Sequence, residues 1–214
     1  MAESTFVRAR RPEHKQQRRD AILVAARDLA VESGVRNVSL GSVAAAVGIA
    51  KSNVVRYFGT REEIYLELAA ECWQEWADEV ARRLGSGDDV IDTLAETLAE
   101  RPLFCDLLGH TSTTLEHNVS VSAAAEFKRT VLGVITEVGA AVAAARPDLT
   151  DVESRDLAAM ASGVASMLYP AANPPPTLVE VYAQNPDLAA ACLPFTPTLK
   201  RALAALAAGL PTLR

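Results

Sequence analysis

The chain has 214 residues, of which half are hydrophobic and 5% are aromatic, and its formal net charge is −6. A chain of this length can bury a substantial core, and this composition excludes an intrinsically disordered protein. Abundant alanine and the lack of sustained alternation between apolar and polar residues favour helices over strands, so we expect an all-α fold.

The N-terminal residues are basic, with Arg8, Arg10 and Arg11 just before Pro12. Residues 1–12 are therefore expected to form either a solvated tail or a flexible arm that touches phosphate or the minor groove of DNA. A first helix is expected over residues 13–33, and its early cations Lys15, Arg18 and Arg19 are placed to approach the DNA backbone.

Residues 39–61 predict two short helices joined by a tight turn. Ser39 is suited to cap the first helix and Gly48 to end it, because glycine adopts a positive φ at low cost. Val54 and Phe58 lie four residues apart, so they form the buried face of a second helix over residues 51–58. This arrangement is a helix-turn-helix, whose exposed second helix can enter the major groove.

This stretch resembles a known family. The segment VGIAKSNVVRYFGTREEIYLEL is similar to the DNA-binding signature of the tetracycline-repressor (TetR) family, whose usual string is close to VSKGTLYYHFKSKEEL. Lys51, Phe58, Glu62 and Glu63 match that string, whereas Val55 stands where the family usually has an aromatic residue that contacts phosphate. The resemblance implies a homodimeric transcriptional regulator with a helical effector-binding domain.

Double-stranded DNA is therefore the expected partner. DNA contacts are expected from Lys51, Ser52, Asn53, Arg56 and Tyr57 on the recognition helix, with phosphate contacts from Ser39, Ser42 and Arg61 at helix N-termini. Residues 1–61 contain 11 Lys and Arg against 5 Asp and Glu, whereas residues 62–214 contain 10 against 22. This asymmetry supports two domains, a DNA-binding domain over residues 1–61 and an effector-binding and dimerisation domain over residues 62–214.

The rest of the chain reads as a series of helices. They are expected over residues 61–84, 88–100, 102–109, after Leu115 to Ala145, 151–169, 177–191 and 197–208. Thr60 and Glu63 predict a capping box at the start of the first of these, in which Glu63 reaches back to the Thr60 amide. That helix joins the two domains and carries apolar residues at four-residue intervals.

A ligand pocket is expected in the second domain, because residues 103–118 mix apolar side chains with a few polar ones, as small-molecule sites do. The expected lining is Trp73, Phe104, Leu107, Leu108, His110, Thr111, Thr114, Leu115, Phe127, Met160 and Met167, with Tyr169 as a further polar group. The alternative is that these are ordinary core residues. Because this set contains no Lys or Arg, the expected effector is largely apolar and either neutral or cationic.

The helix over residues 151–169 carries small residues at Ala158, Ala159, Ser162, Gly163 and Ser166. Together with the helix over residues 197–208, they predict either a four-helix interface across a two-fold axis or close packing inside one subunit. The family resemblance implies the first of these, a homodimer.

Signals for catalysis, metals or cofactors are weak. His110 and His117 lie seven residues apart near Cys105 and Asp106, but no recognised metal-ligand spacing occurs, so no metal, cofactor or catalytic residue is expected. The three cysteines are widely spaced, which favours reduced thiols in a cytosolic protein over a disulfide framework. Neither a secretory signal nor a membrane-spanning stretch is expected.

The sequence thus predicts a cytoplasmic, homodimeric, DNA-binding transcriptional regulator. We expect a repressor that binds a near-palindromic operator and leaves it when a small ligand binds. Two other interpretations compete with it. One is an all-α enzyme or metal-binding protein with a degenerate DNA-binding head, and the other is a regulator whose cavity is filled by side chains.

Overall fold

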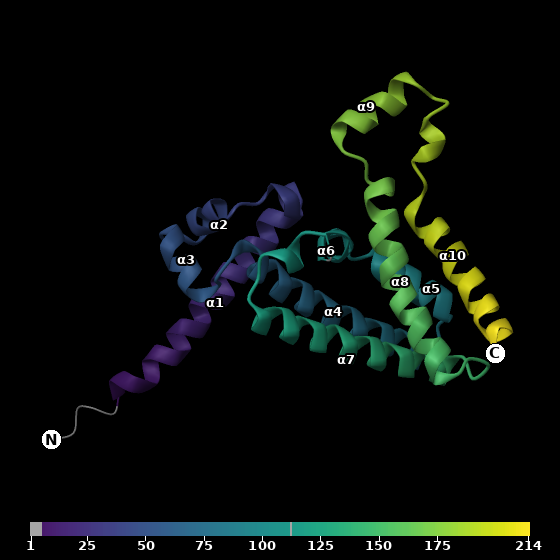
Figure 1. Ribbon diagram of the computed structural model, residues 1–214, viewed down its shortest axis with the longest axis horizontal. Helices are drawn as coiled ribbons and strands as arrows, with labels where there is room; N and C mark the ends of the chain where they lie inside the picture. The colour runs from purple at the N-terminus through teal and green to yellow at the C-terminus, as the bar shows by residue number, and fades with distance from the viewer. Residues whose placement is uncertain (1–5, 112) are drawn as a thin grey trace.

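A computed structural model describes residues 6–111 and 113–214, and all regular structure within them is helical, which confirms the all-α prediction. The α-helices are α1 (Phe6–Ser33), α2 (Leu40–Val47), α3 (Lys51–Tyr57), α4 (Arg61–Gly85), α5 (Val90–Ala99), α6 (Pro102–Thr111), α7 (Val121–Ala145), α8 (Asp151–Ala172), α9 (Pro176–Gln184) and α10 (Phe195–Gly209). Helices α1–α3 form one end of the molecule, and the remaining helices form a larger body (Figure 1).

Helix α1 begins earlier than the sequence predicts. It runs without interruption from Phe6 through Pro12 to Ser33, so residues 6–12 belong to a helix and not to the expected flexible arm. The rest of that arm, residues 1–5, and the side chains of its three arginines lie outside the described residues. Gly34 ends the helix with a φ of 83°.

The local signals of the helix-turn-helix are confirmed. The Ser39 hydroxyl accepts a hydrogen bond from the Ser42 amide (3.0 Å), and the Ser42 hydroxyl accepts one from the Ser39 amide (3.0 Å). Gly48 ends α2 in the left-handed region with a φ of 70°, a conformation that would strain a residue with a Cβ. Val54 and Phe58 are 0% and 2% exposed, so they fasten α3 to the helices behind it.

Helix α4 connects the two ends of the molecule. Its apolar residues at four-residue intervals are all buried: Ile64, Leu68, Cys72, Trp76, Val80 and Leu84. The hydroxyl of Thr60 caps the helix by accepting a hydrogen bond from the Glu63 amide (3.1 Å). The prediction that Glu63 reaches back to the Thr60 amide is wrong. Its carboxylate instead accepts hydrogen bonds from the amides of Gly59 and Ser120, each at 2.9 Å.

The bond from Ser120 explains why α7 starts later than expected. A 3₁₀ helix over Leu115–His117 follows α6, and α7 begins only at Val121. Ser120 is its N-cap, since its hydroxyl accepts a hydrogen bond from the Ala123 amide (3.3 Å) while its own amide is held by Glu63. A contact from α4 therefore sets the start of α7.

The body is built around α4, with α7 packed along it and α8 packed against α6, α7 and α10 (Figure 1). A Cβ at Gly139 of α7 would lie 3.0 Å from the Cα of Arg155 on α8, so glycine allows these two helices to touch through their backbones. Trp73 and Trp76 of α4 and Phe104 of α6 form an aromatic cluster between these two helices, with ring centroids 5.2 to 6.1 Å apart.

Residues 173–194 project from the body between α8 and α10, and we call them the α9 arm (Figure 1). The helix expected over residues 177–191 is here α9, followed after a break by a 3₁₀ helix over Ala189–Ala191. No residue of α9 is buried. At the base of the arm, Tyr169 and Phe195 pack edge to face with their ring centroids 5.8 Å apart.

Within residues 6–111 and 113–214, no helix combines the length and the apolar character that crossing a membrane requires.

Candidate DNA-binding surface and ligand pocket

Helix α3 presents a polar face to solvent. Lys51, Ser52, Asn53 and Arg56 are exposed, and Tyr57 is half-buried at the end of the helix. The opposite side holds Val54, which is fully buried. The residues expected to read bases thus lie on the side of α3 that DNA can reach.

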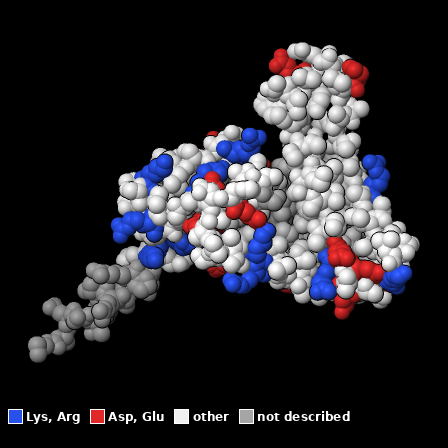
Figure 2. Space-filling view, in the orientation of Figure 1, with Lys and Arg blue, Asp and Glu red and all other residues white. Residues whose placement is uncertain are grey.

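A groove runs between α3 and the early part of α1. It is lined by Lys15, Arg18, Ile49, Asn53, Arg56 and Tyr57, so three cations surround one concave surface. Figure 2 shows Lys and Arg side chains gathered over the end of the molecule that α1–α3 form. Cations in such a groove suit the negatively charged phosphates of a DNA backbone.

Arg19 has a different role from the one expected for it. Its guanidinium donates a hydrogen bond to the Tyr57 carbonyl (2.8 Å) and forms an ion pair with Glu67 of α4. It also lies over the ring of Phe58, 4.1 Å from the centroid. Arg19 therefore joins α1 to the end of α3 and to α4, which corrects the expectation that it approaches the DNA backbone.

The residues expected to contact phosphate differ in their accessibility. Ser39 is exposed and Ser42 is half-buried at the start of α2, where both hydroxyls already cap the helix. The guanidinium of Arg61 donates to the carbonyls of Val38 (2.5 Å) and Val35, and its side chain is only 18% exposed. Arg61 therefore holds the turn before α2, and these bonds occupy the guanidinium that is expected to contact phosphate.

The residues expected to line a ligand pocket do not lie around one cavity. Trp73, Phe104, Leu107, Leu115 and Phe127 are at most 4% exposed and form core. Leu108, His110 and Thr111 are half-buried, and Thr114 is exposed. Met160 and Met167 are 51% and 78% exposed on the outer side of α8, so the prediction that they face the pocket is wrong.

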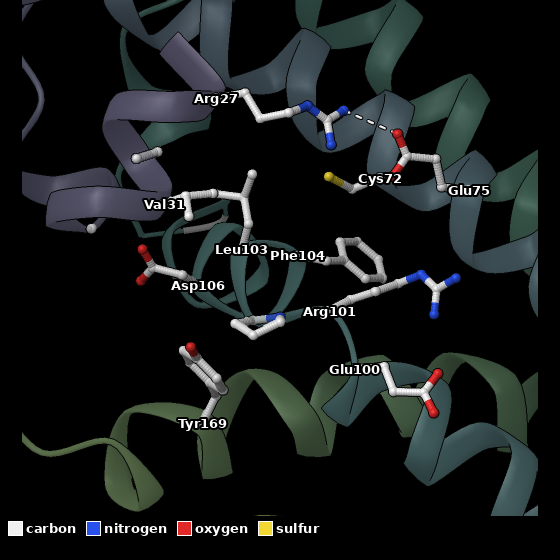
Figure 3. A pocket seen from close by; sticks show the side chains of 13 residues that line it. Arg27, Val31, Cys72, Glu75, Glu100, Arg101, Leu103, Phe104, Asp106 and Tyr169 are labelled. Atoms are coloured by element: carbon white, nitrogen blue, oxygen red, sulfur yellow. Dashed lines mark hydrogen bonds and ion pairs between the residues drawn. The ribbon is translucent and has the colours of Figure 1, made fainter. Parts of the chain in front are cut away.

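The structure instead has a pocket of about 500 Å³ where α1 meets the body. It is lined by Arg27, Ala30, Val31, Gly34, Cys72, Glu75, Glu100, Arg101, Pro102, Leu103, Phe104, Asp106 and Tyr169 (Figure 3). Of the expected lining, only Phe104 and Tyr169 belong to it. Its walls come from α1, α4, α6 and α8 together, and its volume is that of a site for a small organic molecule.

Asp106 connects this pocket to the helix-turn-helix end. Its carboxylate accepts a hydrogen bond from the Val35 amide (2.8 Å), just beyond α1, and lies 3.4 Å from Nε2 of His110. Burial opposes ionisation of Asp106, but the hydrogen bonds from His110 and from the Val35 amide outweigh it and lower the pKa of the carboxyl. The same turn is held from the other side by Arg61.

In the described part of the chain, no three His, Cys, Asp or Glu side chains converge on a point where they could hold a metal ion. Cys72 lies in the pocket wall, and burial raises the pKa of its thiol to about 11. The thiol is therefore protonated near neutral pH and adds no charge to the pocket.

Comparison with known families accounts for nearly all of the helical chain. Residues 22–68 match the profile described as "Bacterial regulatory proteins, tetR family", and residues 70–214 match that described as "Tetracyclin repressor-like, C-terminal domain". The chain belongs to the TetR family. As a member of this family it is a DNA-binding transcriptional regulator. A comparison with curated proteins gives no match.

Solved structures share the TetR fold at low sequence identity. A possible TetR family transcriptional regulator from Streptomyces coelicolor A3(2) has a TM-score of 0.60 and 18% identity, over 92% of this chain and 100% of that one. The multidrug binding protein EbrR complexed with imidazole has a TM-score of 0.55 and 19% identity, over 88% and 94%. FadR from Bacillus subtilis complexed with stearoyl-CoA has a TM-score of 0.55 and 13% identity, over 88% and 97%.

Sequence reasoning missed the residues of this TetR-family pocket that come from α1 and from the start of α6. Arg27 and Val31 lie on the helix assigned to DNA binding, so no pattern linked them to a ligand site. Arg101 lies between the helices expected over residues 88–100 and 102–109, and nothing in the local sequence relates it to a ligand site.

Proposed function

We propose that this TetR-family chain is a repressor that leaves its operator when a small molecule occupies the pocket between α1 and the body. The observation that carries the proposal is the origin of the pocket walls, since α1 supplies one side and α6 another. A ligand held there touches the DNA-binding end and the body at once. Its binding energy therefore depends on how these two parts are arranged, which is the condition for coupling two sites.

The proposed route of coupling runs through the turn that follows α1. Asp106 of α6 holds the Val35 amide, and Arg61 at the start of α4 holds the carbonyls of Val35 and Val38. Because Ser39 then caps α2, a shift of α6 moves the support of the helix-turn-helix. This route runs beside α4, the helix that joins the two domains.

The proposed DNA contacts come from the exposed residues of α3 and the groove beside it. We assign base and phosphate contacts to Lys51, Ser52, Asn53, Arg56 and Tyr57, and additional phosphate contacts to Lys15 and Arg18. Ser39 and Ser42 remain proposed phosphate contacts at the N-terminus of α2. Residues 1–61 form the proposed DNA-binding domain, and residues 62–214 the effector-binding and dimerisation domain.

The protein is proposed to act as a homodimer on a near-palindromic operator. One recognition helix covers too few base pairs for specific binding, so two copies are needed. Helices α8 and α10 supply the proposed interface, because Met160, Gly163 and Met167 lie exposed at helical spacing on α8. Of the small residues expected there, Ala158 and Ser162 are instead buried inside the subunit. A regulator of this kind works where the DNA is, in the cytoplasm, and the proposal assigns it no catalytic step.

Similar proteins support the ligand-dependent part of the proposal. FadR from Bacillus subtilis is in complex with stearoyl-CoA, and the multidrug binding protein EbrR is in complex with imidazole. Two proteins of the same fold therefore hold organic ligands of very different size, which agrees with a fold whose ligand site varies between members.

The test begins with selection of genomic fragments that the protein binds, followed by fluorescence-anisotropy titration of a selected fragment. Arg56→Ala should weaken binding by about 1–3 kcal/mol and reduce the dependence of affinity on salt by roughly one phosphate contact. Arg129→Ala is the matched control, because Arg129 is exposed on α7, away from the groove. Equal affinity of the Arg56 variant and the wild type would contradict the proposed recognition surface.

The ligand-dependent part is tested separately. Compounds that raise the melting temperature are added to the complex of the wild-type protein with its selected fragment. A ligand of the proposed site should weaken DNA binding by about 1–3 kcal/mol, the usual range of coupling between two sites. Stabilising compounds that leave DNA affinity unchanged would contradict the proposed release.

A further inference from the structure

The charged side chains that line the pocket are not equivalent, because most of them already have partners. Arg27 donates to Glu71 and Glu75, each at 3.0 Å, which also satisfies Glu75. Glu100 pairs with Arg83 at 2.5 Å. Asp106 accepts from the Val35 amide and lies beside His110. These four charged side chains therefore already have partners within the protein.

Arg101 is the exception. Its guanidinium donates one hydrogen bond, from Nη1 to the Thr97 carbonyl (2.8 Å), and among the described residues no carboxylate lies within ion-pair distance of it. The residue is half-buried, so water only partly solvates its charge. In Figure 3 its side chain extends along one side of the pocket, while Tyr169 stands at the opposite end.

Between these two ends the wall is mainly apolar. Ala30 and Val31 of α1 and Leu103 and Phe104 of α6 belong to this part of the lining. Phe104 in turn packs edge to face on Trp73, with ring centroids 5.2 Å apart, so its ring is fixed from behind. A ligand that fills this space must offer an apolar body to the middle and polar atoms to the ends.

We propose that the ligand of this pocket is an amphipathic monoanion, whose carboxylate pairs with Arg101 and whose apolar body lies between Val31, Leu103 and Phe104. This inference rests on the proposed function for its regulatory meaning, but not for the binding itself. It replaces the neutral or cationic ligand indicated by the sequence, because that expectation depended on a pocket without Lys or Arg. The fork of guanidinium donors matches a carboxylate in two hydrogen bonds.

The same pocket limits the ligand to a single negative charge. Glu75 and Glu100 also belong to its lining, and both keep about half of their side-chain surface exposed, at 53% and 52%. Both carboxylates already have an arginine partner, so Arg101 is the one lining cation left to pair with a ligand, and the second charge of a dianion would have no partner among the described lining residues. The pocket therefore selects for one carboxylate on an apolar body.

The experiment compares three probes with the same body and different heads: phenylhexanoate, phenylhexanol and phenylhexylamine. Binding is followed near neutral pH by tryptophan fluorescence, because Trp73 lies directly behind Phe104. We expect the wild-type protein to bind the carboxylate at least about tenfold more tightly than the alcohol or the amine, as a charge-assisted pair should produce. This comparison requires no variant. Equal or tighter binding of the alcohol or the amine would overturn the proposal.

A second measurement tests whether the carboxylate of the probe binds at Arg101. Arg101→Gln should remove the preference for the carboxylate and leave alcohol binding unchanged, whereas Arg101→Lys should retain part of it. Arg129→Gln on α7 is the control for loss of an exposed positive charge. A preference that survives Arg101→Gln would overturn the assignment of the head.

Failure of this inference differs from failure of the proposed function. If the carboxylate binds through Arg101 but never releases DNA, the ligand class is supported and the repressor mechanism fails. If an alcohol or an amine releases DNA more effectively than the carboxylate, the repressor mechanism is supported and the ligand class fails.

Discussion

The hydrogen bond between Asp106 and the Val35 amide offers a sharp test of how the two ends of the molecule communicate. Asp106→Ala removes the acceptor and leaves the amide of Val35, a residue only 1% exposed, without its partner. A buried donor left unpaired costs about 1–3 kcal/mol. Since the Asp106 side chain is itself 27% exposed, we expect the lower part of that range, about 1–2 kcal/mol of unfolding free energy.

Asp106→Asn is the matched control, because the amide oxygen of asparagine still accepts a hydrogen bond from Val35. We expect it to cost less than about 1 kcal/mol, since only the charge is lost. Both variants are compared with the wild type by urea denaturation. Ligand-induced release of operator DNA is then measured by anisotropy, and Asp106→Ala should reduce it more than Asp106→Asn does.

The pH dependence of the same pair has a definite sign. The pKa of Asp106 is lowered in the folded protein from its ordinary value of 3.8, so its ionised form stabilises the fold above that value. This contribution is lost as the pH falls through the folded pKa. The stability difference between wild type and Asp106→Asn should therefore shrink as the pH falls below about pH 4. If Asp106→Ala unfolds and releases DNA as the wild type does, the coupling route through Val35 is refuted.

Three further predictions address the interface and the core. Met167→Asp, at a side chain that is 78% exposed on α8, should convert the dimer to a monomer and abolish operator binding, whereas Leu132→Asp on α7, where the wild-type side chain is 67% exposed, should do neither. Sedimentation analysis of both variants checks this, and a dimeric Met167 variant would move the interface elsewhere. Thr97→Val should cost about 1–3 kcal/mol, since the buried Trp76 Nε1–H loses its 2.9 Å acceptor, and chemical denaturation measures the loss. Gly139→Ala should cost about 1–3 kcal/mol by forcing α7 away from α8, and a stability equal to that of the wild type would argue against their backbone contact.

The helix-turn-helix was predictable because its signals are local. Ser39 caps through atoms three residues away, Gly48 needs no partner to adopt its φ, and Val54 and Phe58 follow from helical periodicity. None of these depends on where the rest of the chain goes. The family resemblance extended this stretch to the whole fold, and the family profiles then confirmed it.

The pocket could not be found in the same way, because it depends on which helices meet. The sequence predicts that Met160 and Met167 line the pocket, but the packing of α8 against α6, α7 and α10 leaves both side chains exposed on its outer side. Arg19 and Arg61 show the same limit. Both are cations close to the DNA-binding motif. The carbonyls that they bind, and the Glu67 carboxylate that Arg19 binds, come from 23 to 48 residues away in sequence.

The α9 arm has a consequence for how this protein tolerates change in length. Tyr169 and Phe195 meet at its base, so α8 and α10 are already joined by a packed pair before the arm begins. No side chain of α9 contributes to the core, and a helix of nine residues has little stability of its own in water. The entropy of closing a loop rises only slowly with its length. Residues 173–194 therefore contribute little to the core of a single chain, and we expect a peptide tag or a fluorescent reporter inserted there to disturb folding less than one inserted inside the bundle.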